Sequence, residues 1–310
     1  MNFMSLFNAM PGAIAQGLIW GIMAIGVYIT YRILDIADLT VDGTMCIGGA
    51  VCIMMMLNGY NVWIALFFAL LAGAIAGFVT GIFHTAMGIP PILAGILTQL
   101  ALWSANLKIM GKANQAINVD KYDLLVSLRY IKGVALSKNT IFIVAIIIIA
   151  VIAILYWFFG TELGCSIRAT GCNSNMARAQ GINTNFNKVL GLMVSNGLVA
   201  LSSALLAQYQ GFADINMGRG AIVIGLAAVI IGDAIFGRIF HNFALNLLSV
   251  ALGSVIYYLV LQIVIWLGVD TDLLKMFSAL VVAVFLAIPF WKSKYFSKPV
   301  KRGGNVNAGN

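Results

Sequence analysis

Two short polar segments interrupt apolar stretches of this sequence, and their side chains could contact a polar solute. Residues 37–43 and residues 213–220 each begin with an Ala-Asp pair and lead into a run rich in small residues. A broken helix at membrane depth exposes backbone polar groups, which are tolerated only where they are buried in protein or line a cavity. We therefore expect a solute pathway here. Its candidate residues are Asp38, Thr40, Asp42, Asp214 and Asn216.

The sequence offers no set of residues for catalysis. Paired carboxylates, a nucleophile with its base, and a metal cluster are all missing at plausible spacing. His84 and His241 are isolated histidines, and the four cysteines form no CxxC pair. The phosphate-binding pattern G-x-x-x-x-G-K-S/T is also missing. We expect no metal and no bound cofactor, and any ATP and Mg²⁺ would belong to another chain.

Residues 161–187 form the longest polar interruption in the second half of the chain. Asn173 is a good N-cap, residues 174–180 can form about two helical turns, and Gly181 suits the left-handed position that ends a helix. The sequence therefore predicts a short helix outside the bilayer. An ordinary cytoplasmic loop is the alternative.

The composition excludes an ordinary soluble domain. Of the 310 residues, 62% are hydrophobic and only 9% are charged. The formal net charge of +8 comes from basic residues spread over loops and a tail, without a helical stripe that could follow nucleic acid. We expect a polytopic membrane protein in a lipid bilayer, with no nucleic-acid partner.

The fold class is all-α, with about nine transmembrane helices by the rule of about 20 apolar residues per span. We expect one transmembrane domain over residues 1–291 and a basic, flexible tail over residues 292–310. The expected spans are 12–31, 44–59, 61–84, 90–110, 139–160, 188–209, 219–240, 243–266 and 271–291.

The tail predicts the orientation of the chain. Its lysines and Arg302 stand without acids, which favours a cytoplasmic C-terminus by the positive-inside rule. Four expected spans separate this tail from residues 161–187, so that segment is also expected in the cytoplasm. Nine spans would place the basic loop 111–138 outside, against its charge. We favour the orientation that the tail and the polar segment 161–187 predict.

The two interrupted segments also suggest an internal repeat. Four expected spans on either side of the single span 139–160 would give the two halves opposite orientations. An inverted repeat with breaks at matching positions points to a transport pathway near the bilayer midplane. A stand-alone secondary transporter or a channel could use the same architecture.

The segment 161–187 resembles the coupling segment of ATP-binding-cassette importer permeases of the branched-chain amino-acid and sugar permease superfamily. The likeness rests on a glycine, an Arg-Ala pair, a Gly-x-Asn, a small residue and a closing Gly-Ile. It implies a helix that docks on the ATP-binding subunit and passes motion to the membrane helices. The residues that match the coupling segment are Gly164, Arg168, Ala169, Gly171, Asn173, Ala177, Arg178 and Gly181.

A second resemblance narrows the branch of this superfamily. Residues 33–44, ILDIADLTVDGT, look like a segment of permeases for tryptophan or tyrosine transport. This likeness implies a homodimer or a pair with a paralogue, two ATP-binding subunits that hydrolyse ATP, and an extracytoplasmic substrate-binding protein. The expected place is the inner membrane of a bacterial cell.

We therefore expect a non-enzymatic permease subunit that translocates a small polar solute by alternating access. An amino acid, with an aromatic one favoured, is the leading substrate class. Nucleosides, branched-chain amino acids and sugars remain open, and a secondary transporter is the rival class of protein.

Overall fold

The computed structural model describes residues 3–119, 121–131, 138–237, 239–240, 242–268, 273, 276–284 and 287. These residues are mainly helical, which confirms the all-α class. The helices are α1 (Phe3–Tyr28), η1 (Ile29–Ile33, a π-helical turn), α2 (Thr40–Leu57), α3 (Val62–Thr85), α4 (Pro91–Met110), η2 (Leu128–Ile131, a 3₁₀ turn), α5 (Thr140–Gly160), α6 (Glu162–Cys172), α7 (Ser174–Ala179), α8 (Thr184–Gln210), α9 (Ala221–Phe236) and α10 (Phe243–Trp266).

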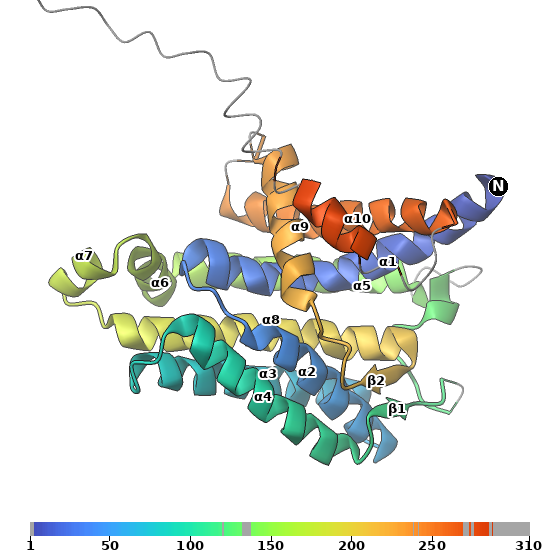
Figure 1. Cartoon of the computed structure of the whole chain (residues 1–310), viewed down its shortest axis with the longest axis horizontal. Coiled ribbons are helices and arrows are strands. Elements are labelled where there is room, and N and C mark those ends of the chain that lie inside the picture. Colours follow the sequence, from blue (N-terminus) through green and yellow to red (C-terminus); the bar gives the residue numbers. More distant parts are fainter. Residues whose placement is uncertain are drawn as a thin grey trace, which may run out of the picture.

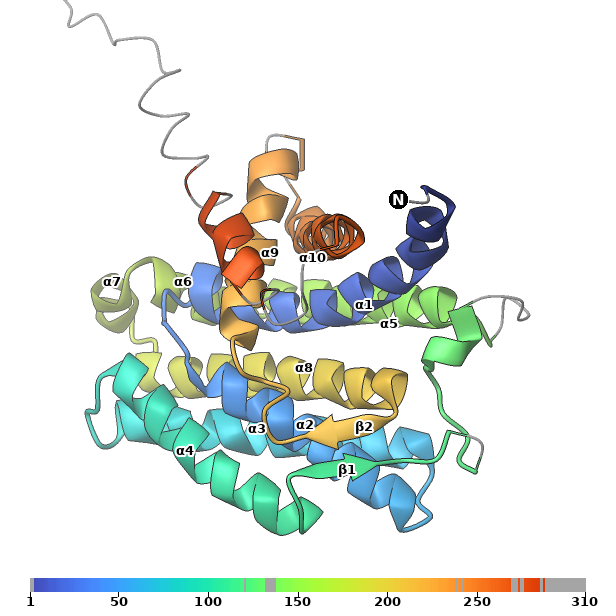
Figure 2. The same ribbon diagram turned by 45° about the vertical axis from the view of Figure 1, so that its right-hand side comes forward.

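Seven helices of the described residues are long and apolar enough to cross a membrane. They correspond to the expected spans one to six and eight. The expected span 219–240 is the shorter helix α9, which crosses the long helices in both views (Figures 1 and 2). The expected span 271–291 and the tail 292–310 lie largely or wholly outside the described residues. The chain is a multi-pass membrane protein, while a count of nine spans stays a prediction.

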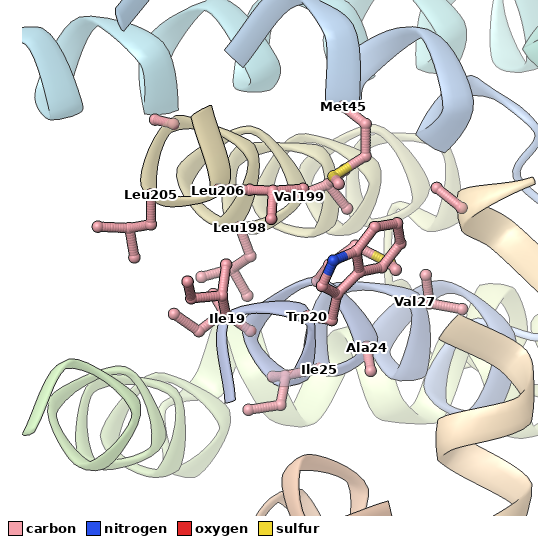
Figure 3. Close-up of a cluster of buried hydrophobic side chains, with 14 of the residues drawn as sticks. Ile19, Trp20, Ala24, Ile25, Val27, Met45, Leu198, Val199, Leu205 and Leu206 are labelled. Carbon is pink, nitrogen blue, oxygen red and sulfur yellow. The ribbon is translucent and has the colours of Figure 1, made fainter. Parts of the chain in front are cut away.

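Helix α8 lies at the centre of the molecule, between α1 on one side and α3 on the other (Figures 1 and 2). Side chains from α1 and α8, together with Met45 of α2, form one buried apolar cluster (Figure 3). Ile19 and Leu205 are completely buried in it. Helix α5, by contrast, carries many exposed apolar side chains, which suits a helix at the periphery.

Glycines allow α3 to approach α8 closely. Gly73, Gly77 and Gly81 recur every fourth residue and face α8. A Cβ at Gly73 would overlap the carbonyl oxygen of Asn196, and one at Gly77 would overlap that of Leu192. Small residues at such spacing let helix backbones pack directly in a membrane protein.

Two short strands join parts of the chain that are far apart in sequence. Strand β1 (Asn114–Ala116) pairs antiparallel with β2 (Phe212–Asp214), with Asn114 opposite Asp214 and Ala116 opposite Phe212. Helices α6 and α7 lie together beyond the end of α1 and next to the start of α8 (left in Figures 1 and 2), and the strand pair lies away from them.

Candidate functional site

The first polar segment follows the π-helical end of α1 and places Asp38 in the interior. The Asp38 side chain is only 3% exposed. Its Oδ1 accepts a hydrogen bond from the backbone N–H of Thr40 at 2.9 Å, and its Oδ2 accepts one from Nδ2 of Asn196 at 2.7 Å. The Oδ1 of Asn196 in turn accepts from the Thr44 hydroxyl at 2.7 Å. Asn196 of α8 therefore fastens both this segment and the start of α2.

Thr40 begins α2 and belongs to a chain of buried hydroxyl groups. Its Oγ1 lies 2.7 Å from Oγ1 of Thr80 on α3, which donates to Oγ1 of Thr98 on α4 at 2.9 Å. The Thr98 hydroxyl can donate to the carbonyl oxygen of Ala94 at 3.0 Å. All three threonines are buried. Buried hydroxyls need such partners, and here they join α2, α3 and α4.

Asp42 is in the first turn of α2, but its partners lie on a distant helix. Its Oδ2 accepts from the backbone N–H of Gly220 and its Oδ1 from that of Ile222, both at 3.1 Å. Helix α9 has an N-terminus without a side-chain cap of its own. A carboxylate there satisfies N–H groups that lack partners within the helix and complements the helix dipole. Asp42 thus caps α9 from outside.

The second polar segment packs directly on the first. The Cys46 thiol on α2 lies 3.1 Å from the carbonyl oxygen of Ile215, and a Cβ at Gly218 would overlap the carbonyl oxygen of Asp42. Asp214 ends strand β2, and its Oδ1 accepts from the backbone N–H of Asn216 at 2.7 Å. Asn216 is exposed. The two segments that resemble each other in sequence therefore meet in space, at the start of α2 and of α9.

The polar segment 161–187 folds into the helices α6 and α7 and the first turn of α8. The predicted short helix is α7, whose N-cap Asn173 accepts from the backbone N–H groups of Asn175 and Met176 at 3.1 and 3.0 Å. After it, Gly181 has a φ of 81°, its N–H donates to the carbonyl of Arg178, and the N–H of Ile182 donates to that of Ala177. This pair of bonds is a Schellman motif. Helix α6, which precedes α7, was not predicted.

The small residues of this segment face the rest of the chain. Gly164 packs on the backbone of Phe158 and Phe159, and Ala177 is only 3% exposed. A Cβ at Gly171 would overlap the carbonyl oxygen of Ile33, the last residue of η1. These positions hold α6 and α7 against the membrane helices. Gly171 also brings the segment into direct contact with the helix end that leads to Asp38.

The outer face of the segment carries polar groups and one methionine. Asn173, Arg178 and Gly181 are exposed, as is Met176, whose side chain is 64% exposed. The Nε of Arg178 donates to the Thr184 hydroxyl at 2.8 Å and so ties α7 to α8. Ala169 is half-buried on α6.

Arg168 lies apart from the outer face of α7. Its guanidinium carbon is 5.3 Å from the ring centroid of Phe243, at the start of α10. This is within the range of a cation–π contact. Arg168 therefore links α6 to the start of α10.

Sequence reasoning missed Asn196 and Met176. Asn196 is an amide within an apolar helix, and a polar residue in such a position was a signal that could have been used. Met176 gave no comparable signal, because a methionine in a short helix is compatible with burial or exposure. Its position depends on how α7 sits on α8.

Comparisons with known proteins agree with this architecture. Residues 10–289 match a family described as the branched-chain amino acid transport system / permease component. The tyrosine transport system permease protein of Clostridioides difficile is 39% identical over 272 residues, which cover 88% of each chain. The fructose import permease protein FruF of Bifidobacterium longum is 27% identical over 86% of this chain and 73% of its own.

A solved structure has the same fold. PsaBC from Streptococcus pneumoniae in complex with Fab aligns with a TM-score of 0.54 and 17% identity, over 95% of this chain and 99% of that one. The family match spans most of the sequence, and the relatives are transporter permease subunits, which are not themselves enzymes. The chain belongs to the permease family of branched-chain amino acid transport systems.

Proposed function

We propose that the chain is the membrane subunit of an ATP-driven importer that carries a small polar solute, with an amino acid, and among amino acids an aromatic one, favoured. The observation that carries the importer proposal is α7, a capped helix on a segment that projects beyond the membrane helices. The 39% identity to a tyrosine transport permease supports an amino acid as the solute. Branched-chain amino acids, nucleosides and sugars are the alternatives, and a fructose permease is among the relatives.

The partners follow from this proposal. Two ATP-binding subunits would hydrolyse ATP with Mg²⁺ and dock on α7, and a substrate-binding protein would deliver the solute from outside. This chain would form a homodimer or pair with a paralogue. It would lie in the inner membrane of a bacterium as one domain over residues 1–291, with α7 and the tail 292–310 in the cytoplasm.

The contacts suggest how motion of α7 would reach the solute pathway. Helix α7 leads directly into α8, whose Asn196 holds Asp38. Gly171 on α6 packs against Ile33 just before the same segment. From α2, Asp42 reaches the N-terminus of α9. We propose that Asp38 and Thr40 keep the first break rigid, while Asp42, Asp214 and Asn216 lie along the pathway.

The test is copurification with an ATP-binding subunit. The tagged chain would be expressed with its chromosomal neighbours, as wild type and as Met176→Glu. Because Met176 is exposed, this change should leave the fold intact and weaken docking at least about tenfold, by the loss of an apolar contact and the addition of a charge. Gly171 and Ala177 are unsuitable positions, because they pack inside the chain.

The matched control is Met87→Glu. Met87 is 63% exposed and lies outside the coupling segment, so this variant should copurify like the wild type. Loss of the partner in Met176→Glu alone supports the proposal. A chain that purifies without any ATP-binding subunit and still moves solute into liposomes would establish the secondary-transporter alternative instead.

A further inference from the structure

A cavity of about 320 Å³ lies where the two polar segments meet. It is bordered by α2, by α4 and by the turn between β2 and α9. Its lining includes an acid, a base, two amides and an indole, namely Asp42, Arg219, Gln99, Asn106 and Trp103. The sequence named Asp42 alone among these as a pathway residue, and nothing in the family match assigns a solute to this cavity.

The charges of this cavity suit a molecule that carries both a positive and a negative charge. The N-terminus of α9 is already occupied by Asp42, so an anionic solute group cannot use these backbone N–H groups. The Asp42 carboxylate accepts from the backbone N–H groups of Gly220 and Ile222 and also interacts with that of Ala221. A carboxylate has about four lone-pair sites, so it can still accept from an ammonium group. The exposed Arg219 offers a guanidinium, which binds carboxylates well.

Asn106 adds a buried acceptor. Its side chain is 0% exposed, and its Nδ2 lies 3.5 Å from the carbonyl oxygen of Gly43, which orients the amide. Among the residues that the structure describes, its Oδ1 has no hydrogen-bond partner. A buried acceptor without a partner costs about 1–3 kcal/mol. A donor on a bound solute, reached by a small opening of the cavity wall, would remove this cost.

The cavity also has an apolar side on α4. Trp103 is 47% exposed and Leu100 is 64% exposed, and both border the cavity. An indole face can stack on an aromatic ring or cover an aliphatic chain. A solute with charged groups at one end and an apolar side chain at the other would match both sides.

We propose that this cavity binds a zwitterionic amino acid, with its carboxylate on Arg219, its ammonium group facing Asp42 and Asn106, and its side chain against Trp103. The site deepens the proposed function, and its assignment rests on the chain being an amino-acid permease. It also gives Asp42 two tasks, since the same carboxylate caps α9 and faces the solute.

The experiment measures binding to the full chain in lipid nanodiscs. The probe is radiolabelled L-tyrosine, displaced by unlabelled L-tyrosine, by tyramine, which lacks the carboxylate, and by 3-(4-hydroxyphenyl)propionate, which lacks the ammonium group. We expect each analogue to bind at least about tenfold more weakly than L-tyrosine, the effect of about 1.4 kcal/mol from one lost charged contact. L-Leucine as a competitor tests whether an aliphatic side chain is also accepted.

Two variants and one control locate the site. Arg219→Gln should weaken the binding of L-tyrosine about tenfold and leave the binding of tyramine unchanged, because only the carboxylate of a ligand loses its partner. Asn106→Leu should weaken the binding of L-tyrosine and of tyramine, which carry the ammonium group. It should leave the binding of 3-(4-hydroxyphenyl)propionate unchanged. Lys112→Gln removes an exposed positive charge outside the cavity lining and should bind all three as the wild type does.

The outcomes distinguish a failure of the proposed binding site from a failure of the proposed importer function. If an ATP-binding subunit copurifies while Arg219→Gln binds L-tyrosine like the wild type, the site is wrong and the importer proposal stands. Absence of saturable amino-acid binding at millimolar concentration, or displacement by neutral sugars alone, also overturns the site. Binding that follows the expected pattern in a chain that recruits no ATP-binding subunit supports the site and contradicts the importer proposal.

Discussion

The two polar segments have the same local bonding in very different surroundings. In each, an aspartate Oδ1 accepts the backbone N–H two residues later, at 2.9 Å for Asp38 and 2.7 Å for Asp214. In each, the Oδ2 accepts from an asparagine amide, Asn196 at 2.7 Å and Asn114 at 3.1 Å. Asp38 is buried, whereas Asp214 is half-buried and its contact with Asn114 is exposed.

This comparison shows that the motif sets its local hydrogen bonds but does not set how deeply it is buried. The turn made by each aspartate is local, because a short polar side chain readily bonds its own backbone two residues on. Burial depends on the partner element: Asn196 comes from the central helix α8, and Asn114 comes from strand β1. Asp38 of the first segment is fixed inside the molecule, whereas Asp214 of the second segment lies nearer the surface. The inverted symmetry of the two halves stays a prediction.

The largest expected effect concerns the two aspartates. Asp38→Ala leaves the buried Thr40 N–H without its acceptor and removes one of the two acceptors of the Asn196 amide, which keeps the carbonyl of Leu192. We therefore expect the free energy of unfolding to fall by about 3 kcal/mol. Asp214→Ala should cost less than about 1 kcal/mol, because water can replace its partners. Unfolding of the purified variants in detergent micelles, followed by circular dichroism, would measure both. Equal losses would contradict the contrast between the segments.

A smaller effect is expected from two glycines of the second segment. Gly218→Ala places a methyl group against the carbonyl oxygen of Asp42 and should cost about 2 kcal/mol, within the range for overpacking. Gly220→Ala has open space, and its φ of 83° alone should cost about 1 kcal/mol. The same unfolding assay ranks the two. A larger loss of stability in Gly220→Ala than in Gly218→Ala would show that the two segments do not pack closely.

The smallest effect concerns the cap that joins the segments. Asp42→Ala removes the acceptor for the first N–H groups of α9 and should cost about 1 kcal/mol, and Asp42→Asn should cost less, because asparagine also caps helices. Amide hydrogen exchange at residues 220–222 would measure the effect directly. Unchanged exchange in Asp42→Ala would mean that this cap does not hold α9.

Local patterns accounted for much of the fold and for part of the candidate site. Apolar runs predicted the membrane class and the bounds of six of the seven long helices closely, all but those of α1. Asn173 with Gly181 predicted α7, because caps act over a few residues. Helix α6 was missed because its residues are mixed in polarity and it depends on Gly164 and Gly171 packing on other helices. Gly171, which matches the coupling segment in sequence, packs against Ile33 of the same chain, a contact that no local pattern indicates.

The sequence by itself determined that the chain crosses a membrane many times, where its helices break, and that a short capped helix forms within residues 161–187. These features follow from solvation of apolar runs and from hydrogen bonds between neighbouring residues. Only the tertiary structure decided that Asp42 caps α9 and that Arg219 and Asn106 share its cavity. Such contacts join residues far apart in the chain, and the packing of small residues between helices, which brings them together, leaves no periodic signal in the sequence.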